Sequence, residues 1–330
     1  MLSLDQIRSL HIELTTNCNA RCPMCMRNYR GYNYNSGYPI TELRLPEIKK
    51  IFSVTFLDQI NNINFNGNLG DFGLAKDASK IVEYFLHNSQ AKIQIETNGS
   101  MRLPSWWATL SNPRISILWA LDGLADTHSL YRQDTDWQRV IDNAQAHIRA
   151  GGNSVWKFIP FDHNKHQLEQ CRSLSKQLGF TNFIINDQGR SQGPVFSREG
   201  EFSHWLGNSQ AQPADLNELK QSHVSWFDKN KVPDCIEESA PIDCKHLKIK
   251  ELYIAADGTI YPCCWLGFYP NSMQHAGNSQ FRHIVQKNNA LQYDLDTCMS
   301  WFADVEKTWN KTSMRDGKLH TCMSNCSVRQ

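Results

Sequence analysis

The chain has 330 residues, a formal net charge of +1 and 20% charged residues. A net charge so near zero gives no strong field to attract nucleic acid or an anionic membrane surface, so we expect neither as a partner. Because the first residues lack a basic segment before an apolar core, and no run of about 18 apolar residues occurs, we expect a soluble, cytoplasmic protein whose eleven cysteines serve metal or redox chemistry.

Short apolar, β-branched runs alternate with longer helical patterns from residue 9 to about 187. This alternation predicts repeated βα units and a parallel sheet, and six strands suit an α/β partial barrel. The predicted strands are Leu10–Leu14, Ile63–Asn66, Ile93–Thr97, Ile115–Leu121, Val155–Phe161 and Phe183–Asn186. The predicted helices are Leu45–Phe56, Ala75–His87, Trp137–Ala150 and His166–Leu178. In barrels of this kind, reactive groups gather at the C-terminal ends of the strands.

Three cysteines follow the first predicted strand, with the spacing C-x3-C-x2-C: Cys18, Cys22 and Cys25. Three thiolates can hold three irons of a four-iron cubane and leave the fourth iron open to a substrate or cofactor. The alternative is a zinc knuckle or a buried thiol cluster. Zinc structural sites usually take four ligands in two pairs, and no fourth Cys or His pairs with this triplet locally.

With Met24 before the third cysteine and Glu13-Leu14-Thr15 ahead of the first, this stretch resembles the signature of radical S-adenosylmethionine (SAM) enzymes. The resemblance implies a partial (β/α)6 TIM barrel and a 4Fe-4S cluster on Cys18, Cys22 and Cys25 whose open iron chelates SAM. It also implies an external electron donor such as flavodoxin or ferredoxin. Reductive cleavage of SAM then gives a 5'-deoxyadenosyl radical that abstracts a hydrogen atom from the substrate.

Gly67, Gly70 and Asp71 follow the second predicted strand, where the family commonly has a Gly-Gly-Glu-Pro stretch that binds the SAM amino group. The resemblance makes these three residues candidates for SAM binding. A carboxylate at Asp71 could accept a charge-assisted hydrogen bond from the ammonium group, and glycines let the backbone approach a ligand. The alternative for Asp71 is an N-cap of the next helix.

Thr97-Asn98-Gly99 and Leu121-Asp122-Gly123 end the next two strands and resemble further motifs of the family. Asn98 and Asp122 are candidates for binding ribose or substrate hydroxyls, and Arg132 is a candidate for binding a carboxylate or phosphate. All three could instead belong to turns or to the surface. Lys157 lies in an otherwise apolar strand and is therefore a candidate substrate contact.

The C-terminal region is rich in cysteine, and its run from Leu252 to Cys264 has the form of a hairpin with an Asp-Gly turn. The spacing of Cys244 and Cys263, completed by Cys322 and Cys326, resembles the SPASM and twitch extensions of radical SAM enzymes. That resemblance implies a second, auxiliary 4Fe-4S cluster on these four cysteines. Zinc is the alternative metal for such a set. Cys235, Cys264 and Cys298 remain as spare thiols, and Cys171 is predicted to lie in the core.

We therefore expect three parts. They are a radical SAM barrel core over residues 1–188, a linker or bridging segment over 189–232, and a small α+β cysteine-rich, twitch-like domain over 233–330. The expected reaction oxidises, cross-links or otherwise modifies a peptide or protein side chain or a small sugar-like metabolite. Two alternatives stay open: an epimerase with a cysteine hydrogen donor, and a non-catalytic zinc or iron-sulfur protein that binds or senses redox state.

Overall fold

The computed structural model describes residues 2–25, 27–28, 30–32, 39–187, 193–207, 215–218, 239–268 and 283–328. The strands are β1 Ser9–Ile12, β2 Asn62–Phe65, β3 Lys92–Thr97, β4 Ile115–Ala120, β5 Asn153–Phe158, β6 Asn182–Ile185, β7 Gly193–Phe196, β8 Phe202–Leu206, β9 Glu251–Ile254 and β10 Ile260–Tyr261. Within these ranges β10-β9-β1-β2-β3-β4-β5-β6 form one sheet, and β7 and β8 form a separate antiparallel pair. Strands β1 to β6 are all parallel, so the predicted α/β sheet is confirmed.

Side chains alternate between the two faces of this sheet, as the two-residue period of a strand requires. One row, which crosses β1 to β4 in register, consists of Leu10, Ile63, Ile93 and Ile115, and all four are buried. The row displaced by one residue is polar and consists of His11, Asn64, Gln94 and Ser116. We call the face that carries the polar row the inner face.

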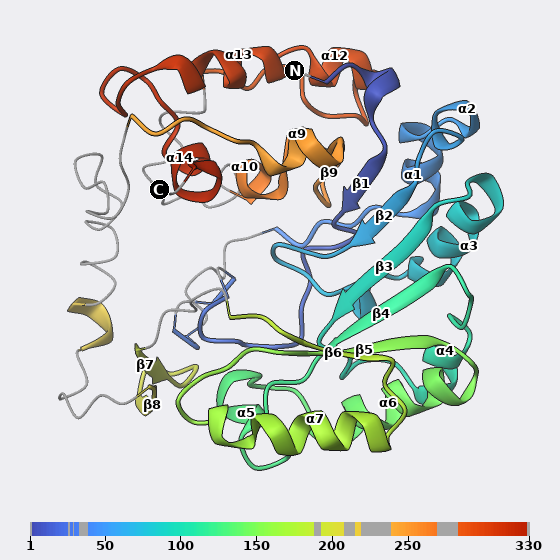
Figure 1. The fold of residues 1–330 in the computed structure, drawn as a ribbon, viewed down its shortest axis with the longest axis vertical. Helices are drawn as coiled ribbons and strands as arrows, with labels where there is room; N and C mark the ends of the chain where they lie inside the picture. The colour runs from blue at the N-terminus through green and yellow to red at the C-terminus, as the bar shows by residue number, and fades with distance from the viewer. Residues whose placement is uncertain are drawn as a thin grey trace.

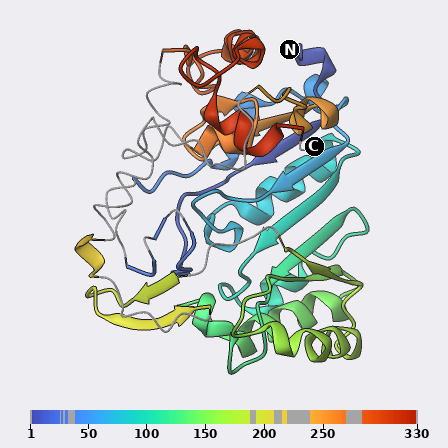
Figure 2. The ribbon, with the colours of Figure 1, turned by 60° about the vertical axis from the view of Figure 1, so that its left-hand side comes forward.

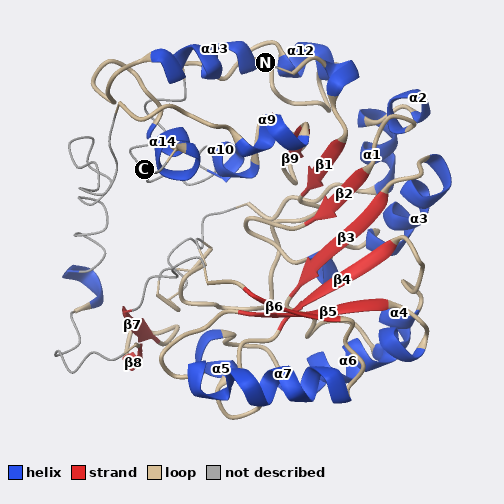
Figure 3. Ribbon diagram, viewed as in Figure 1, coloured by secondary structure: helices blue, strands red, loops and turns tan. Residues whose placement is uncertain are grey.

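Helices pack on the apolar face of the sheet and connect its parallel strands (Figures 1 and 3). These helices are α1 Leu45–Ile51, α2 Val54–Leu57, α3 Ala78–Asn88, α4 Pro104–Ala108, α5 His128–Tyr131, α6 Trp137–Arg149 and α7 Leu168–Gln177. The large rings of Trp107, Trp119 and Trp156 are completely buried in the core between the layers. None of the described helices has the length and apolar character that crossing a membrane requires.

Two predicted helices differ from the observed ones in their bounds. The predicted helix Leu45–Phe56 is two helices, since Phe52 is extended and the Ser53 hydroxyl accepts a hydrogen bond from the Phe56 amide as a new N-cap. The helix predicted to begin at Ala75 begins at Ala78, because a short 3-10 turn, Phe72–Leu74, comes first.

The predicted C-terminal hairpin forms, and it joins the main sheet. Strand β9 pairs in parallel with β1 and antiparallel with β10, and Gly258 occupies the turn with a φ of +82°. The C-terminal helices are α9 Lys245–Ile249, α10 Cys264–Phe268, α12 Leu295–Met299, α13 Phe302–Lys307 and α14 His320–Cys326. Figure 1 shows α9 and α10 beside β9 and α14 beyond α10, with α12 and α13 across the same end of the molecule.

The hydroxyl of Ser154 on β5 is expected to stabilise the core between the sheet and α6. It accepts from Trp119 Nε1 at 3.0 Å and lies 2.8 Å from His147 Nδ1, and all three residues are fully buried. Ser154→Ala leaves these ring nitrogens without that partner, so we expect the free energy of unfolding to fall by about 1–3 kcal/mol. Denaturant unfolding measures this loss. Ser116→Ala on the neighbouring strand is the control, and an equal loss in both variants would contradict the assignment.

Candidate functional site

The three N-terminal cysteines lie in the loop that follows β1, at the C-terminal edge of the parallel sheet. We call residues 15–25 and 27–28 of this loop the cysteine loop. Two tight turns shape this loop, in which the Cys25 amide donates to the Cys22 carbonyl at 3.0 Å and the Asn28 amide to the Cys25 carbonyl at 2.9 Å. Cys22 is buried, while Cys18 and Cys25 are partly exposed. The loop therefore presents its thiols at the place where the sequence predicts reactive groups.

Two other predicted residues bring donors to the sulfur atoms of this loop. Asn98, just after β3, directs its Nδ2 to Cys18 Sγ at 3.8 Å, and Arg132, just after α5, directs its Nη1 to Cys22 Sγ at 3.7 Å. Asp122, after β4, fixes Arg132 through a 2.6 Å bond to its Nε and also accepts from the Ile159 amide at 2.6 Å. These three residues thus converge on the cysteine loop, while their contact with SAM stays a prediction.

The electrostatics of the thiols suit a cationic centre. Burial raises the pKa of Cys18 well above its ordinary value, and the charges of Asp71, Cys22 and Cys25 raise it further. Burial also raises the pKa of Cys22 to about 11, although Arg132 opposes this rise. Burial thus disfavours the thiolate form of Cys18 and Cys22, and the positive charge of an iron-sulfur cluster would offset that penalty when the sulfurs bind its irons. The donor set therefore fits such a cluster.

The glycine loop, which we define as residues 67–71, packs directly on the start of the cysteine loop. A Cβ atom at Gly70 would lie 1.7 Å from the Thr15 carbonyl oxygen, and one at Gly67 would lie 2.3 Å from the Gly70 carbonyl oxygen. The Asp71 amide also donates to the Asn17 carbonyl at 2.9 Å. Glycine is required here because the backbone of this loop touches the backbone before Cys18.

Asp71 is buried, and its carboxylate accepts hydrogen bonds from protein groups. Its oxygens accept from the Gly73 amide at 2.9 Å, the Thr97 hydroxyl at 2.8 Å and the Asn98 amide at 2.7 Å. The bond from Gly73 is the N-cap that the sequence left open as the alternative. Asp71 also holds Asn98 in place beside Cys18.

Glu13 is a residue of this site whose role the sequence did not predict. It is buried at the end of β1, and its Oε1 accepts from the amides of Leu69 at 2.7 Å and Gly70 at 2.9 Å. The sequence signal that could have identified this role is a carboxylate at the end of an apolar strand, because a buried charge needs hydrogen-bond or ion-pair partners.

Strands β7 and β8 form a hairpin that lies beside the cysteine loop (Figure 2). It lies within the segment predicted to be a linker or bridge. Its buried Val195 and Leu206 share an apolar cluster with Ala20 and Cys22, and Cys18 and Cys25 pack against that cluster. The hairpin therefore forms an apolar wall of the site.

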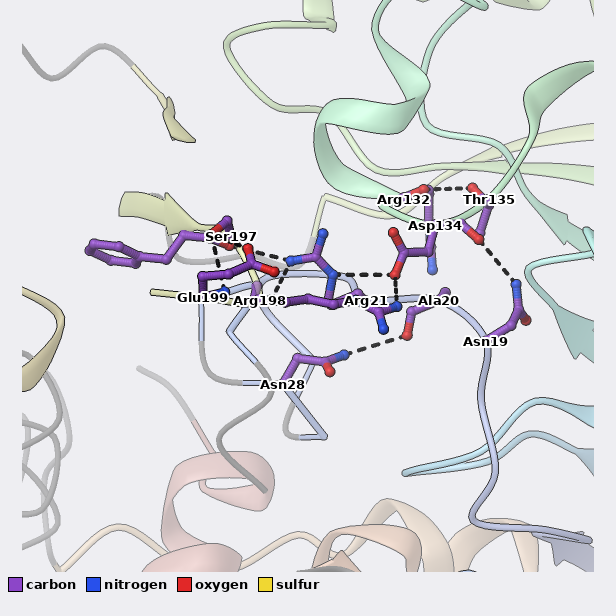
Figure 4. Close-up of polar contacts among 12 residues, drawn as sticks. Asn19, Ala20, Arg21, Asn28, Arg132, Asp134, Thr135, Ser197, Arg198 and Glu199 are labelled. Carbon is purple, nitrogen blue, oxygen red and sulfur yellow. Dashed lines mark hydrogen bonds and ion pairs between the residues drawn. The ribbon is translucent and has the colours of Figure 1, made fainter. Parts of the chain in front are cut away.

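Ion pairs fasten this hairpin to the cysteine loop (Figure 4). Asp134 lies between two guanidinium groups, with its Oδ2 3.3 Å from Nε of Arg21 and bonded to Nη2 of Arg198. Arg21 stands between Cys18 and Cys22 in the sequence and also donates to the Gly31 carbonyl at 2.7 Å. The cysteine loop is thus attached to elements that are remote in sequence.

Lys157, predicted as a substrate contact, projects from β5 and forms an ion pair with Glu96 of β3. The Nζ to Oε2 distance is 2.6 Å, and the two side chains keep 22% and 20% of their surface exposed. Both stand on inner-face positions, so this pair is polar and partly accessible beside the candidate site.

The four C-terminal cysteines predicted as ligands line one cavity. The atom-free space of this cavity, part of it open to solvent, is about 560 Å³. The lining includes Cys244, Cys263, Cys322 and Cys326 together with apolar side chains such as Leu266, Met299, Phe302 and Trp309. The pKa of Cys244 is raised by its hydrogen bond to Cys326 and by burial, and burial raises the pKa of Cys322 to about 12.

The remaining cysteines lie elsewhere. Cys298 is fully buried on α12, Cys171 is fully buried on α7 as predicted, and Cys264 is partly exposed at the start of α10. Cys235 lies outside the described residues. In the described ranges, no three His, Cys, Asp or Glu side chains are grouped closely enough to hold one metal ion.

Gly70→Ala is expected to prevent iron loading of the N-terminal site, because its methyl group would collide with the backbone at Thr15 and displace the cysteine loop. Iron per chain after anaerobic reconstitution measures the effect, and we expect a loss of about four irons. Gly73→Ala is the control, since its Cβ would meet no atom closer than 3.1 Å. Full iron loading of Gly70→Ala would contradict this account of the loop.

No protein-family model matches the chain, and no curated protein matches it. Solved structures do match. Histidine-tagged anSMEcpe with bound AdoMet has a TM-score of 0.56 and 15% identity, over 98% of this chain and 86% of that chain. Native anSMEcpe with AdoMet and Cp18Cys peptide has a TM-score of 0.53 and 15% identity, over 97% and 89%. Streptococcus suis SuiB bound to precursor peptide SuiA has a TM-score of 0.54 and 14% identity, over 98% and 73%. The chain therefore shares the fold of anSMEcpe and SuiB over nearly its whole length.

Proposed function

We propose that the chain is a radical SAM enzyme that cleaves SAM reductively and abstracts a hydrogen atom from its substrate. The observation that carries this proposal is the placement of Asn98 against Cys18 and of Arg132 against Cys22, in the loop at the C-terminal edge of a parallel sheet. Cys18, Cys22 and Cys25 would hold a 4Fe-4S cluster that, when reduced and bound to SAM, supplies a 5'-deoxyadenosyl radical. An external donor such as flavodoxin or ferredoxin would deliver the electron.

The chain's own residues orient and shield this centre. Asp122 holds the Arg132 guanidinium so that one nitrogen faces Cys22, and Asp71 holds the backbone of Asn98 beside Cys18. Donors aimed at thiolate sulfurs stabilise their negative charge. The apolar side chains of Val195 and Leu206 exclude water from one side of the loop. A dry, fixed surrounding of this kind limits side reactions of a reactive intermediate.

The C-terminal cysteines would hold an auxiliary 4Fe-4S cluster. Support comes from the four thiols that line one largely apolar cavity, because low solvent access and a thiolate donor set suit such clusters. We assign this centre the role of accepting the substrate electron or of binding the substrate. The net reaction is then an oxidation or cross-link.

The substrate that we propose is a peptide or protein side chain, with a small sugar-like metabolite as the second class. Support for a peptide comes from similar structures, since SuiB was solved with the precursor peptide SuiA and anSMEcpe with the Cp18Cys peptide. The Lys157–Glu96 pair on the inner face offers hydrogen-bonding groups that would suit either class.

Formation of 5'-deoxyadenosine from SAM under a strong reductant tests the proposed reaction. We expect the wild type to form it, and the variant with Cys18, Cys22 and Cys25 all changed to alanine to form none, because that variant lacks the thiolates that bind the cluster. Cys171→Ala, which removes a buried thiol on α7, is the matched control and keeps the reaction. Iron-loaded wild type that leaves SAM intact would refute the proposal.

Metal content tests the auxiliary centre. After anaerobic reconstitution we expect about eight irons per chain, falling to about four when Cys322 and Cys326 are changed to alanine. Cys298→Ala serves as the control and keeps all the iron. About four irons with one zinc in the wild type would instead make the C-terminal site a structural zinc centre.

A further inference from the structure

Tyr253 of β9 connects the C-terminal cysteine module, which we define as residues 239–268 and 283–328, to the glycine loop. Its hydroxyl donates to Glu13 Oε2 at 2.9 Å and accepts from Asn68 Nδ2 at 3.0 Å. The same Asn68 nitrogen donates to the Cys264 carbonyl at 2.9 Å. The phenol therefore stands between two residues that hold the glycine loop, one at the end of β1 and one in the loop itself.

Glu13 transmits this contact to the loop backbone. Its Oε2 is bound by Tyr253, while its Oε1 accepts from the amides of Leu69 and Gly70. The carboxylate is buried, and burial raises its pKa while these three hydrogen bonds oppose the rise. Three donors on one buried carboxylate leave it little freedom to move without losing a bond.

The ring of Tyr253 is itself held in one position. The parallel register places it beside His11, and the two rings meet edge to face with centroids 5.0 Å apart. Gly267 of α10 also comes so close that a Cβ atom there would lie 2.3 Å from the tyrosine ring. Because the phenol is fixed and its only polar atom bonds to both Glu13 and Asn68, it restricts the positions of these two side chains. We call this contact between Tyr253, Glu13 and Asn68 the bracket.

We propose that Tyr253 is a positioning residue for SAM: it fixes Glu13 and Asn68, and through them the glycine loop, so that the C-terminal cysteine module sets the affinity for SAM. The inference rests on the proposed function and on the SAM-binding role that the sequence resemblance predicts for the glycine loop. Because coupling between two sites is reciprocal, SAM also stabilises the packing of the module against β1.

Equilibrium binding of SAM to the reconstituted full chain, without reductant, tests the bracket. Tyr253→Phe keeps the ring and removes the hydroxyl, and we expect SAM to bind about tenfold more weakly, as for the partial loss of a hydrogen bond to a charged group. In 5'-deoxyadenosine formation the KM for SAM rises while kcat stays near that of the wild type. The iron content stays unchanged, because the thiols are untouched.

Tyr261→Phe is the matched control, since it removes a second buried tyrosine hydroxyl in the same hairpin, and SAM affinity stays at the wild-type value. Asn68→Ala is the second variant, and it is expected to weaken SAM binding as well. Because Asn68 is partly exposed, this variant tests the proposal even if Tyr253→Phe fails to fold. Wild-type affinity in a fully iron-loaded Tyr253→Phe or Asn68→Ala variant overturns the bracket. Absence of SAM binding by the iron-loaded wild type instead overturns the proposed function itself.

Discussion

The parallel pairing of β1 between β2 and β9 is the constraint on which both cysteine sets depend. In this register Ile12 lies opposite Phe65 on one side and Ile254 on the other, so three strands end at the same edge of the sheet. The first strand leads into the cysteine loop, the second into the glycine loop and the third into the turn before Cys263. A slip by one residue in either ladder would turn His11 and Glu13 away from their partners.

Two ion pairs lie beside the cysteine loop, and their contributions to the free energy of folding differ. Asp122 is fully buried and Arg132 is 16% exposed, and losing one partner of a buried pair costs about 3–5 kcal/mol because the other charge is left unpaired. The pair of Arg198 and Asp134 is largely open to solvent, where such pairs contribute about 0–1 kcal/mol. The position of the guanidinium beside Cys22 is thus set firmly, while the hairpin is held mainly by its buried Val195 and Leu206.

The sequence predicted the features that depend on local pattern. Apolar β-branched runs located the six parallel strands, and the spacing of Cys18, Cys22 and Cys25 led to the prediction of an iron-sulfur site, because both signals lie within a few residues. Pairings between distant segments were not predictable in this way. The residues near β9 carry no signal that this strand pairs with β1. The β7–β8 hairpin was not predicted because the composition around β7 is polar and few of its residues point inward. Glu13 was visible as a buried-strand carboxylate, but its partners come from two other elements. The Ser53 cap was missed because the apolar periodicity continues through it.

The position of β9 in the sheet bears on the order of events during synthesis. Glu13 and Tyr253 meet although 240 residues separate them in the chain. Contacts of such high sequence separation form late, since a long loop must close first. During synthesis, β1 therefore has one open edge until β9, Glu251–Ile254, has emerged from the ribosome, and during that time its backbone groups can pair with other chains.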